Sequence, residues 1–150
     1  MTESIQQAVL NLLARRDYSR YEIRLKLVSK QYDTGDIENV LDDFSRRGWQ
    51  CDDRFAEAYI RHRSKAGVGP LKIAHELKKK QVDSHCVDRY LYSDEVDWSD
   101  CIQSVWRKKF NQIPRDFKAK SKQIRFLLQR GFEPDRVQRL LNQINKDDVL

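Results

Sequence analysis

The chain has 150 residues, of which 39% are hydrophobic and 35% are charged, and it contains only 5 Gly. This composition is typical of a helical globular protein and excludes a disordered chain, and no apolar run approaches the ~20 residues that a membrane-spanning helix needs. The formal net charge is +6, and the three widely spaced Cys favour a reduced, cytoplasmic protein over a disulfide framework.

The first third of the chain predicts three short helices. Ser4 has the position of an N-cap before the first apolar stripe, because its hydroxyl can accept a free N–H group of the first turn. Ser19 and Glu22 have the spacing of a capping box, which starts a second helix that runs to about Gln31. The third helix ends near Gly48. The apolar positions that predict these helices are Ile5, Val9, Leu12, Leu13, Ile37, Val40, Leu41 and Phe44.

The middle third predicts a similar triplet. Asp52 or Asp53 is the expected N-cap of its first helix. The sequence AGVGP breaks the chain, and Pro70 then begins a second helix, at a position where the missing N–H costs nothing. A short third helix ends at Leu91. The expected inward positions are Phe55, Tyr59, Ile60, Ile73, Leu77 and Val87.

The last third predicts three further helices. The first opens near Asp97 and is broken by the sequence NQIPRD. The second has its apolar positions at Ile124 and Leu128 and reaches Gly131, where a left-handed C-terminal cap favours glycine. The last helix ends near Ile144. The apolar stripe of the first of these helices is Ile102, Val105, Trp106 and Phe110.

One pattern recurs every 50 residues, in LVSKQYDTGDIENVL (27–41), LKKKQVDSHCVDRYL (77–91) and LLQRGFEPDRVQRLL (127–141). Each stretch indicates a helix end, a tight turn and a new helix, which Asp33, Asp83 or Glu133 caps. A period of this length is typical of a repeat architecture. The expected fold is therefore all-α: three tandem, helix-turn-helix-like three-helix repeats at residues 1–50, 51–95 and 96–150, in an elongated, curved array.

Nothing in the sequence indicates catalysis. His62, His75 and His85 lack metal-ligand spacing, and neither H-x-x-x-H nor C-x-x-C occurs. GVGP has two glycines but lacks the rest of a phosphate-binding loop. Adjacent Asp52 and Asp53 diverge on a helix and cannot act as an acid–base pair. We expect no enzyme activity, no metal and no cofactor.

The basic residues are more informative. Residues 101–150 hold 12 Lys/Arg against 5 Asp/Glu, whereas the charges of the preceding thirds nearly balance. This asymmetry favours a polyanionic or acidic partner, with a merely solvated helix face as the alternative. Trp98, Trp106, Tyr90 and Phe110 could stack on bases, although aromatic residues at helical spacing usually belong to the core. The candidate contact residues are Arg61, Arg63, Lys72, Lys78, Lys79, Arg107, Lys108, Lys109, Lys118, Lys122, Arg125 and Arg130.

Four stretches resemble, in order, signatures of the RecX family: RRDYSRYEIRLKL (15–27), CDDRFAEAYIRHR (51–63), GVGPLKIAHEL (67–77) and RFLLQRGF (125–132). The resemblance covers about residues 8–141 and implies a noncatalytic regulator of the RecA recombinase. Such a protein binds RecA and RecA–DNA filaments, limits filament extension or blocks the filament groove, and so inhibits strand exchange, ATP hydrolysis and coprotease activity. We expect a scaffold role for the motif residues Asp52, Asp53, Arg54, Phe55, Gly69, Pro70 and Gly131.

Two other functions use the same helices. A direct nucleic-acid-binding protein that acts without RecA would bind single- or double-stranded DNA through the same cations. An adaptor for another acidic protein is the third possibility, which the resemblance ranks lower. In each case we expect a cytoplasmic monomer that does not contact a membrane.

Overall fold

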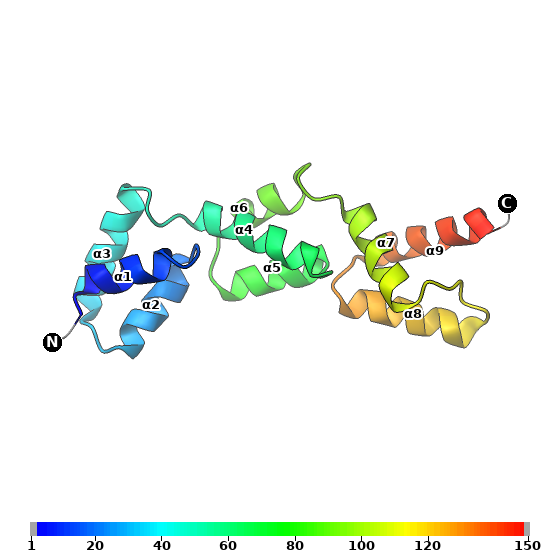
Figure 1. The fold of residues 1–150 in the computed structure, drawn as a ribbon, viewed down its shortest axis with the longest axis horizontal. Coiled ribbons are helices and arrows are strands. Elements are labelled where there is room, and N and C mark those ends of the chain that lie inside the picture. Colours follow the sequence, from blue (N-terminus) through cyan, green and yellow to red (C-terminus); the bar gives the residue numbers. More distant parts are fainter. Residues whose placement is uncertain (1–2, 149–150) are drawn as a thin grey trace. The chain divides into compact units, whose positions relative to one another are not determined.

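The computed structural model describes residues 3–148, and in this range it confirms the all-α prediction (Figure 1). Every regular element in the range is a helix, and the order matches three successive triplets. The elements are α1 (Ile5–Leu13), α2 (Arg20–Ser29), α3 (Thr34–Arg46), α4 (Asp52–Lys65), α5 (Pro70–Lys79), α6 (Ser84–Leu91), α7 (Trp98–Lys109), α8 (Phe117–Gln129) and α9 (Pro134–Asp148). We call α1–α3 the first triplet, α4–α6 the second and α7–α9 the third.

The chain packs into two compact units. The first unit runs up to Tyr59 and includes Leu77–Asp88. The second unit consists of Ile60–Glu76 and the described chain from Arg89 onward. The boundary passes through α4, α5 and α6, so the second triplet contributes residues to both units.

The caps predicted for the first triplet form as expected. The Ser4 hydroxyl accepts the Gln7 backbone N–H at 3.1 Å. Ser19 and Glu22 complete a reciprocal capping box, and Asp33 accepts the Asp36 N–H at 3.1 Å. These bonds satisfy N–H groups that have no partner within their own helix.

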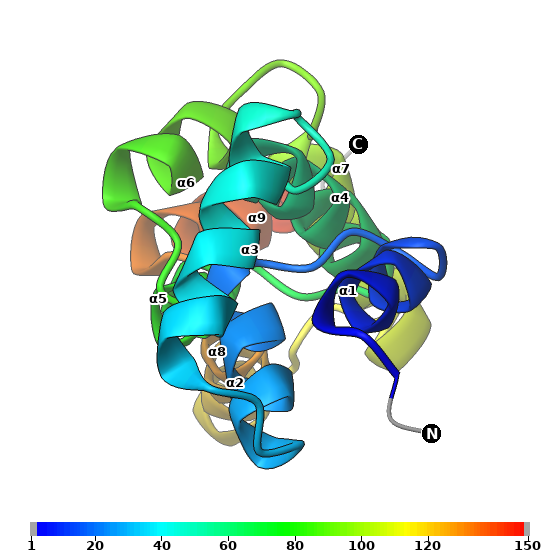
Figure 2. The ribbon, with the colours of Figure 1, turned by 90° about the vertical axis from the view of Figure 1, so that its left-hand side faces the viewer.

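The three helices of the first triplet (Figure 2) enclose one core, in which Phe44 is almost completely buried. The buried residues of this core are Ala8, Val9, Tyr18, Ile23, Leu27, Ile37, Val40, Leu41 and Phe44. Burial of these side chains is the main stabilising contribution of the triplet, because its helices are too short to be stable alone.

The 50-residue period appears directly in the backbone. The middle helix of each triplet closes with a 6→1 hydrogen bond, as in a Schellman motif. In each bond a backbone N–H donates to a backbone carbonyl: Tyr32 to Leu27 (3.3 Å), Val82 to Leu77 (3.2 Å) and Phe132 to Leu127 (3.2 Å). The residue between helix and turn has a positive φ in each case: Gln31 (68°), Gln81 (57°) and Gly131 (101°). The left-handed cap predicted at Gly131 is therefore confirmed.

Two tryptophans belong to the interior of the second unit. Trp98 is 5% exposed and its indole N–H donates to the Leu91 carbonyl at 2.7 Å. Trp106 is 8% exposed and donates to the Gln123 side-chain oxygen at 2.9 Å. Both indoles are thus used in packing, as the core interpretation predicts, and neither is available to stack on a base. Tyr90 and Phe110 are half-buried.

Two details differ from the sequence predictions. On α8 the buried positions are Gln123 and Leu127, whereas Leu128 is 40% exposed. The predicted apolar stripe, Ile124 and Leu128, is therefore shifted by one residue from the buried positions, because a polar residue such as Gln123 is not expected in a core. The last helix continues to Asp148, four residues beyond the predicted end.

Candidate functional site

The DDRF motif at the start of α4 connects segments of the first unit that are distant in sequence. One Asp52 carboxylate oxygen accepts the backbone N–H of Arg20 and the Gln50 side-chain amide, both at 2.9 Å. Arg20 is the first residue of α2, so Asp52 satisfies a free N–H group at the start of the helix that Ser19 caps. The prediction that Asp52 or Asp53 is the N-cap of α4 is wrong, because α4 begins at Asp52 and both residues lie in its first turn.

The next two residues of the motif complete this connection. The Arg54 guanidinium donates to Asp17 at 3.0 Å and to the carbonyls of Gly48 and Trp49 at 3.1 and 3.0 Å. Phe55 is 3% exposed. The motif therefore holds the start of α4 against the loops that precede α2 and α4.

A second connection in the first unit joins the N-terminal end of α2 to the C-terminal end of α5. Lys80 donates to the Glu22 carboxylate at 2.9 Å, and Arg16 lies 3.3 Å from the same carboxylate. Burial raises the pKa of Glu22, but the bonds from Lys80 and Arg16 outweigh burial and lower it overall. This connection therefore uses charged side chains.

The equivalent connection in the second unit uses backbone atoms. The Gly69 N–H donates to the Arg130 carbonyl at 2.7 Å, and the Leu71 N–H donates to the Gly131 carbonyl at 2.9 Å. A Cβ added at Gly69 would lie 2.4 Å from the Gly131 carbonyl carbon, and one added at Gly131 would lie 2.4 Å from the Lys72 Cβ. Only glycine permits this approach, and Pro70 between the two donors has no N–H to satisfy.

Most cations of the first triplet are paired with carboxylates. Arg20 lies 3.1 Å from Glu38 and 2.6 Å from Asp42, and Arg24 lies 2.6 Å from Glu38. The bond from Arg24 is the main reason that the pKa of Glu38 falls to about 2. Burial lowers the pKa of Arg20, but the bonds to Asp42 and Glu38 raise it overall. Further ion pairs of this triplet involve Arg16, Lys30, Arg46 and Arg47.

The third triplet is different. Over residues 101–132 the sequence holds nine Lys/Arg and a single acidic residue, Asp116, which caps α8 by accepting the Ala119 N–H at 2.8 Å. Within the described part of the chain, the exposed cations of α7, α8 and the loop between them form no ion pair. These exposed residues, which we call the basic surface, are Arg107, Lys108, Lys109, Arg115, Lys118, Lys122 and Arg125.

The remaining candidate cations fall into three groups. Arg63 forms two bonds to Glu76, at 3.0 and 2.8 Å, and is therefore engaged within the protein. Arg61 is exposed on α4, and Lys72 is exposed beside Gly131. Lys78 and Lys79 are exposed at the end of α5 and belong to the first unit, whereas the basic surface belongs to the second unit.

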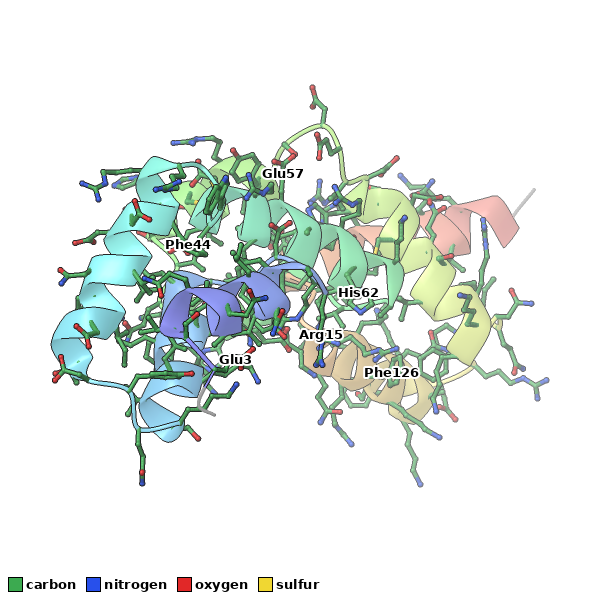
Figure 3. All side chains as sticks on the ribbon, turned by 60° about the vertical axis from the view of Figure 1, so that its left-hand side comes forward. Glu3, Arg15, Phe44, Glu57, His62 and Phe126 are labelled. Atoms are coloured by element: carbon green, nitrogen blue, oxygen red, sulfur yellow. The ribbon has the colours of Figure 1, made fainter. Side chains whose placement is uncertain are left out.

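An aromatic pair lies beside two cations, Lys109 at the end of α7 and Arg130 at the end of α8. Phe126 (Figure 3) contacts Phe110 edge-on at 5.4 Å between centroids, and Lys109 and Arg130 lie 5.3 and 5.7 Å from its ring centroid. The Arg130 Nε is buried without a hydrogen-bond partner among the described residues. Burial raises the pKa of the nearby Cys101 thiol, which Asp100 reinforces and the Arg130 charge opposes. Arg130 thus contributes to packing as well as to charge.

Sequence reasoning missed Phe117. This side chain is 84% exposed, the largest value among the exposed large hydrophobic residues described. It is the first residue of α8, which begins three residues earlier than the 50-residue spacing from Arg20 and Pro70 predicts. The sequence gives no signal for this exposure, because Phe117 shares a helix face with the predicted stripe of Ile124 and Leu128, and only the structure shows that Gln123 and Leu127 are the buried positions.

The described residues form neither a metal centre nor a membrane span. No group of three or more His, Cys, Asp or Glu in this range could hold a metal ion. None of the described helices has the length and apolar character required to cross a membrane.

Family models match the chain in three successive ranges: the first three-helix domain of RecX at residues 7–44, the second at 52–91 and the third at 95–141. Regulatory protein RecX of Legionella pneumophila (strain Corby) is 39% identical over 151 aligned residues, which cover 100% of both chains. Regulatory protein RecX of Haemophilus ducreyi is 35% identical over 141 residues, 93% of each chain. The crystal structure of RecX from Lactobacillus salivarius has a TM-score of 0.80 at 23% identity over 94% of each chain, which supports the fold. The chain therefore belongs to the RecX family.

Proposed function

We propose that this RecX-family protein is a noncatalytic regulator that binds RecA and the RecA–DNA filament. Binding inhibits the recombinase, ATPase and coprotease activities of RecA, by blocking the filament groove or limiting filament extension. Family membership supports this proposal, because matching relatives over the whole chain are named regulatory protein RecX. We further propose that the protein acts as a cytoplasmic monomer.

The proposed contact is supported by a difference between the first and third triplets in how many cations form ion pairs. In the first triplet, most cations already bind carboxylates, so a partner would have to compete with existing bonds. On the basic surface, the cations are exposed and form no ion pair with another described residue. An anionic partner therefore gains their full attraction without breaking an internal pair. We infer that the third triplet provides the main electrostatic contact.

Charge reversal tests this contact. The variant Lys118→Glu/Lys122→Glu/Arg125→Glu changes three exposed side chains, so it should fold like the wild type and inhibit RecA ATP hydrolysis much less. The matched control is Arg15→Glu/Lys65→Glu/Lys146→Glu, which alters the net charge equally at exposed positions outside the candidate set. The control should inhibit like the wild type. Equal inhibition by both variants, with unchanged circular dichroism, would place the contact elsewhere.

Salt dependence distinguishes the two kinds of anionic partner. If the cations contact phosphates, the logarithm of the binding constant falls linearly with the logarithm of the salt concentration, with a slope of about −0.7 for each charge neutralised on a single strand. This binding persists without RecA. Contact with RecA carboxylates also weakens with salt but requires RecA. A chain that binds DNA yet leaves RecA activity unchanged at saturation would support the alternative function, a nucleic-acid-binding protein that acts without RecA.

A further inference from the structure

We propose that the basic surface binds a single nucleic-acid strand directly, and that Phe117 stacks on an unpaired base. This inference rests on the proposed role of the third triplet as the electrostatic contact and specifies the chemistry of its ligand. It assigns a contact to the side chain at the start of α8 that neither the core nor the ion pairs explain.

Phe117 is unusual for its position as well as its exposure. The middle helices of the first two triplets begin at Arg20 and Pro70, whereas α8 has an additional first turn that carries Phe117 and Lys118. No aromatic contact or cation–π pair involves Phe117 in the described residues. An exposed phenyl ring that contributes little to folding is a ready stacking surface.

The cations lie where a strand that stacks on Phe117 would need them. With 3.6 residues per turn, Lys118, Lys122 and Arg125 lie about 80–140° around α8 from Phe117. The buried Leu127 is on the other side of the helix from these cations. The three cations span roughly 10 Å along the helix axis at 1.5 Å per residue. Phe117 therefore borders a cationic stripe on the exposed half of α8.

The helix terminus itself is not the anion site. Asp116 accepts the Ala119 N–H and places a carboxylate at the start of α8. Attraction for phosphate must therefore come from the side chains along the helix.

The combination of an aromatic ring with cations favours a single strand over a duplex or an acidic protein segment. Bases of a duplex are stacked on each other, so their faces are not available to Phe117 without unstacking. An acidic peptide would satisfy the cations but has no general need for an aromatic face. A single strand uses both, because its phosphates follow the cations and every base offers a face for stacking.

The test uses the full-length protein without RecA and two labelled probes of equal length, an oligothymidylate and an abasic strand with the same phosphates. Phe117→Leu keeps an apolar side chain but removes the aromatic face, and Phe117→Trp keeps an aromatic face. Phe117→Leu should weaken oligothymidylate binding by about tenfold and leave binding to the abasic strand unchanged. Phe117→Trp should bind both probes at least as well as the wild type.

A cation variant provides the matched control. Lys118→Gln/Lys122→Gln should weaken binding to both probes by a similar factor, because both probes carry phosphates. The ratio of the two affinities does not depend on the folded fraction, so the comparison holds even for a variant that is partly unfolded.

Three results would overturn the inference. Wild-type affinity of Phe117→Leu for oligothymidylate would exclude stacking, as would an equal loss for both probes. Weaker inhibition of RecA by Phe117→Leu with unchanged strand binding would assign the ring to a protein contact. Absence of wild-type binding to either probe at low salt would reject direct strand binding while leaving the proposed action on RecA intact.

Discussion

Replacement of Gly69 by Ala tests the backbone connection between α5 and α8. No positive φ is required at Gly69, so an Ala there has no intrinsic backbone strain. Its Cβ would, however, lie 2.4, 2.5 and 2.6 Å from three backbone atoms of Gly131 and Phe132. Backbone atoms cannot rotate away as a side chain can, so α5 and α8 must separate.

Separation breaks the Gly69–Arg130 and Leu71–Gly131 hydrogen bonds, at 2.7 and 2.9 Å. Each bond contributes about 1 kcal/mol net, and a buried group left without a partner costs about 1–3 kcal/mol. We therefore expect Gly69→Ala to reduce the free energy of unfolding by about 2–4 kcal/mol.

Substitutions at two other glycines distinguish the cost of a steric contact from the cost of a left-handed backbone. Gly48 has φ +72° and open space where an added Cβ would lie, so Gly48→Ala should cost only the left-handed conformation, about 1–2 kcal/mol. Gly131 combines φ +101° with a close contact, so Gly131→Ala should be the most destabilising of the three. Urea unfolding can be followed by far-ultraviolet circular dichroism, which reports on the helices of both units. A Gly69→Ala midpoint equal to that of the wild type would refute the close-approach argument.

Three further perturbations have defined outcomes. Asp52→Ala should cost about 1 kcal/mol in urea unfolding, because the Arg20 N–H at the start of α2 loses its carboxylate acceptor. Pro70→Ala should change the urea midpoint little, since Pro is only well suited to a first helical position. The depressed pKa of Glu38, about 2 against an ordinary 4.5, gives a stabilisation that is complete above pH 4.5 and is lost as pH falls toward 2. Because the Glu38 side chain is 45% exposed, this contribution is small and is weakened by salt. The melting temperature of Glu38→Gln should therefore fall less than that of the wild type as the pH is lowered from 4.5 toward 2.

Local signals predicted the helices and their order well. Ser4, Ser19 and Asp33 cap helices as their spacing predicts, because a cap depends on residues only two or three positions apart. The 50-residue repeat predicted where each middle helix ends. It did not predict a left-handed conformation at Gln31 and Gln81, since glutamine gives no local signal for positive φ.

Long-range contacts explain the failures. The Asp52 carboxylate binds Arg20, 32 residues away, and no local pattern distinguishes that partner from the N–H groups of its own helix. Charge counting identified the basic third of the chain but could not separate Arg63, which binds Glu76, from exposed Lys122. Likewise, Phe117 is recognised as a candidate only once the buried register of α8 is known.

The glycine motifs and the basic surface are physically related. In the first unit, the connection between α2 and α5 uses the Lys80–Glu22 pair, and Arg54 is occupied by Asp17. In the second unit, the glycine connection holds α5 against α8 through backbone bonds and uses no charged side chain. The joint therefore adds no carboxylate to α8 and does not lower the positive potential of the basic surface. Close backbone approach thus joins α5 to α8 without a charged pair, so every exposed cation of the basic surface stays available to the anionic partner that we propose.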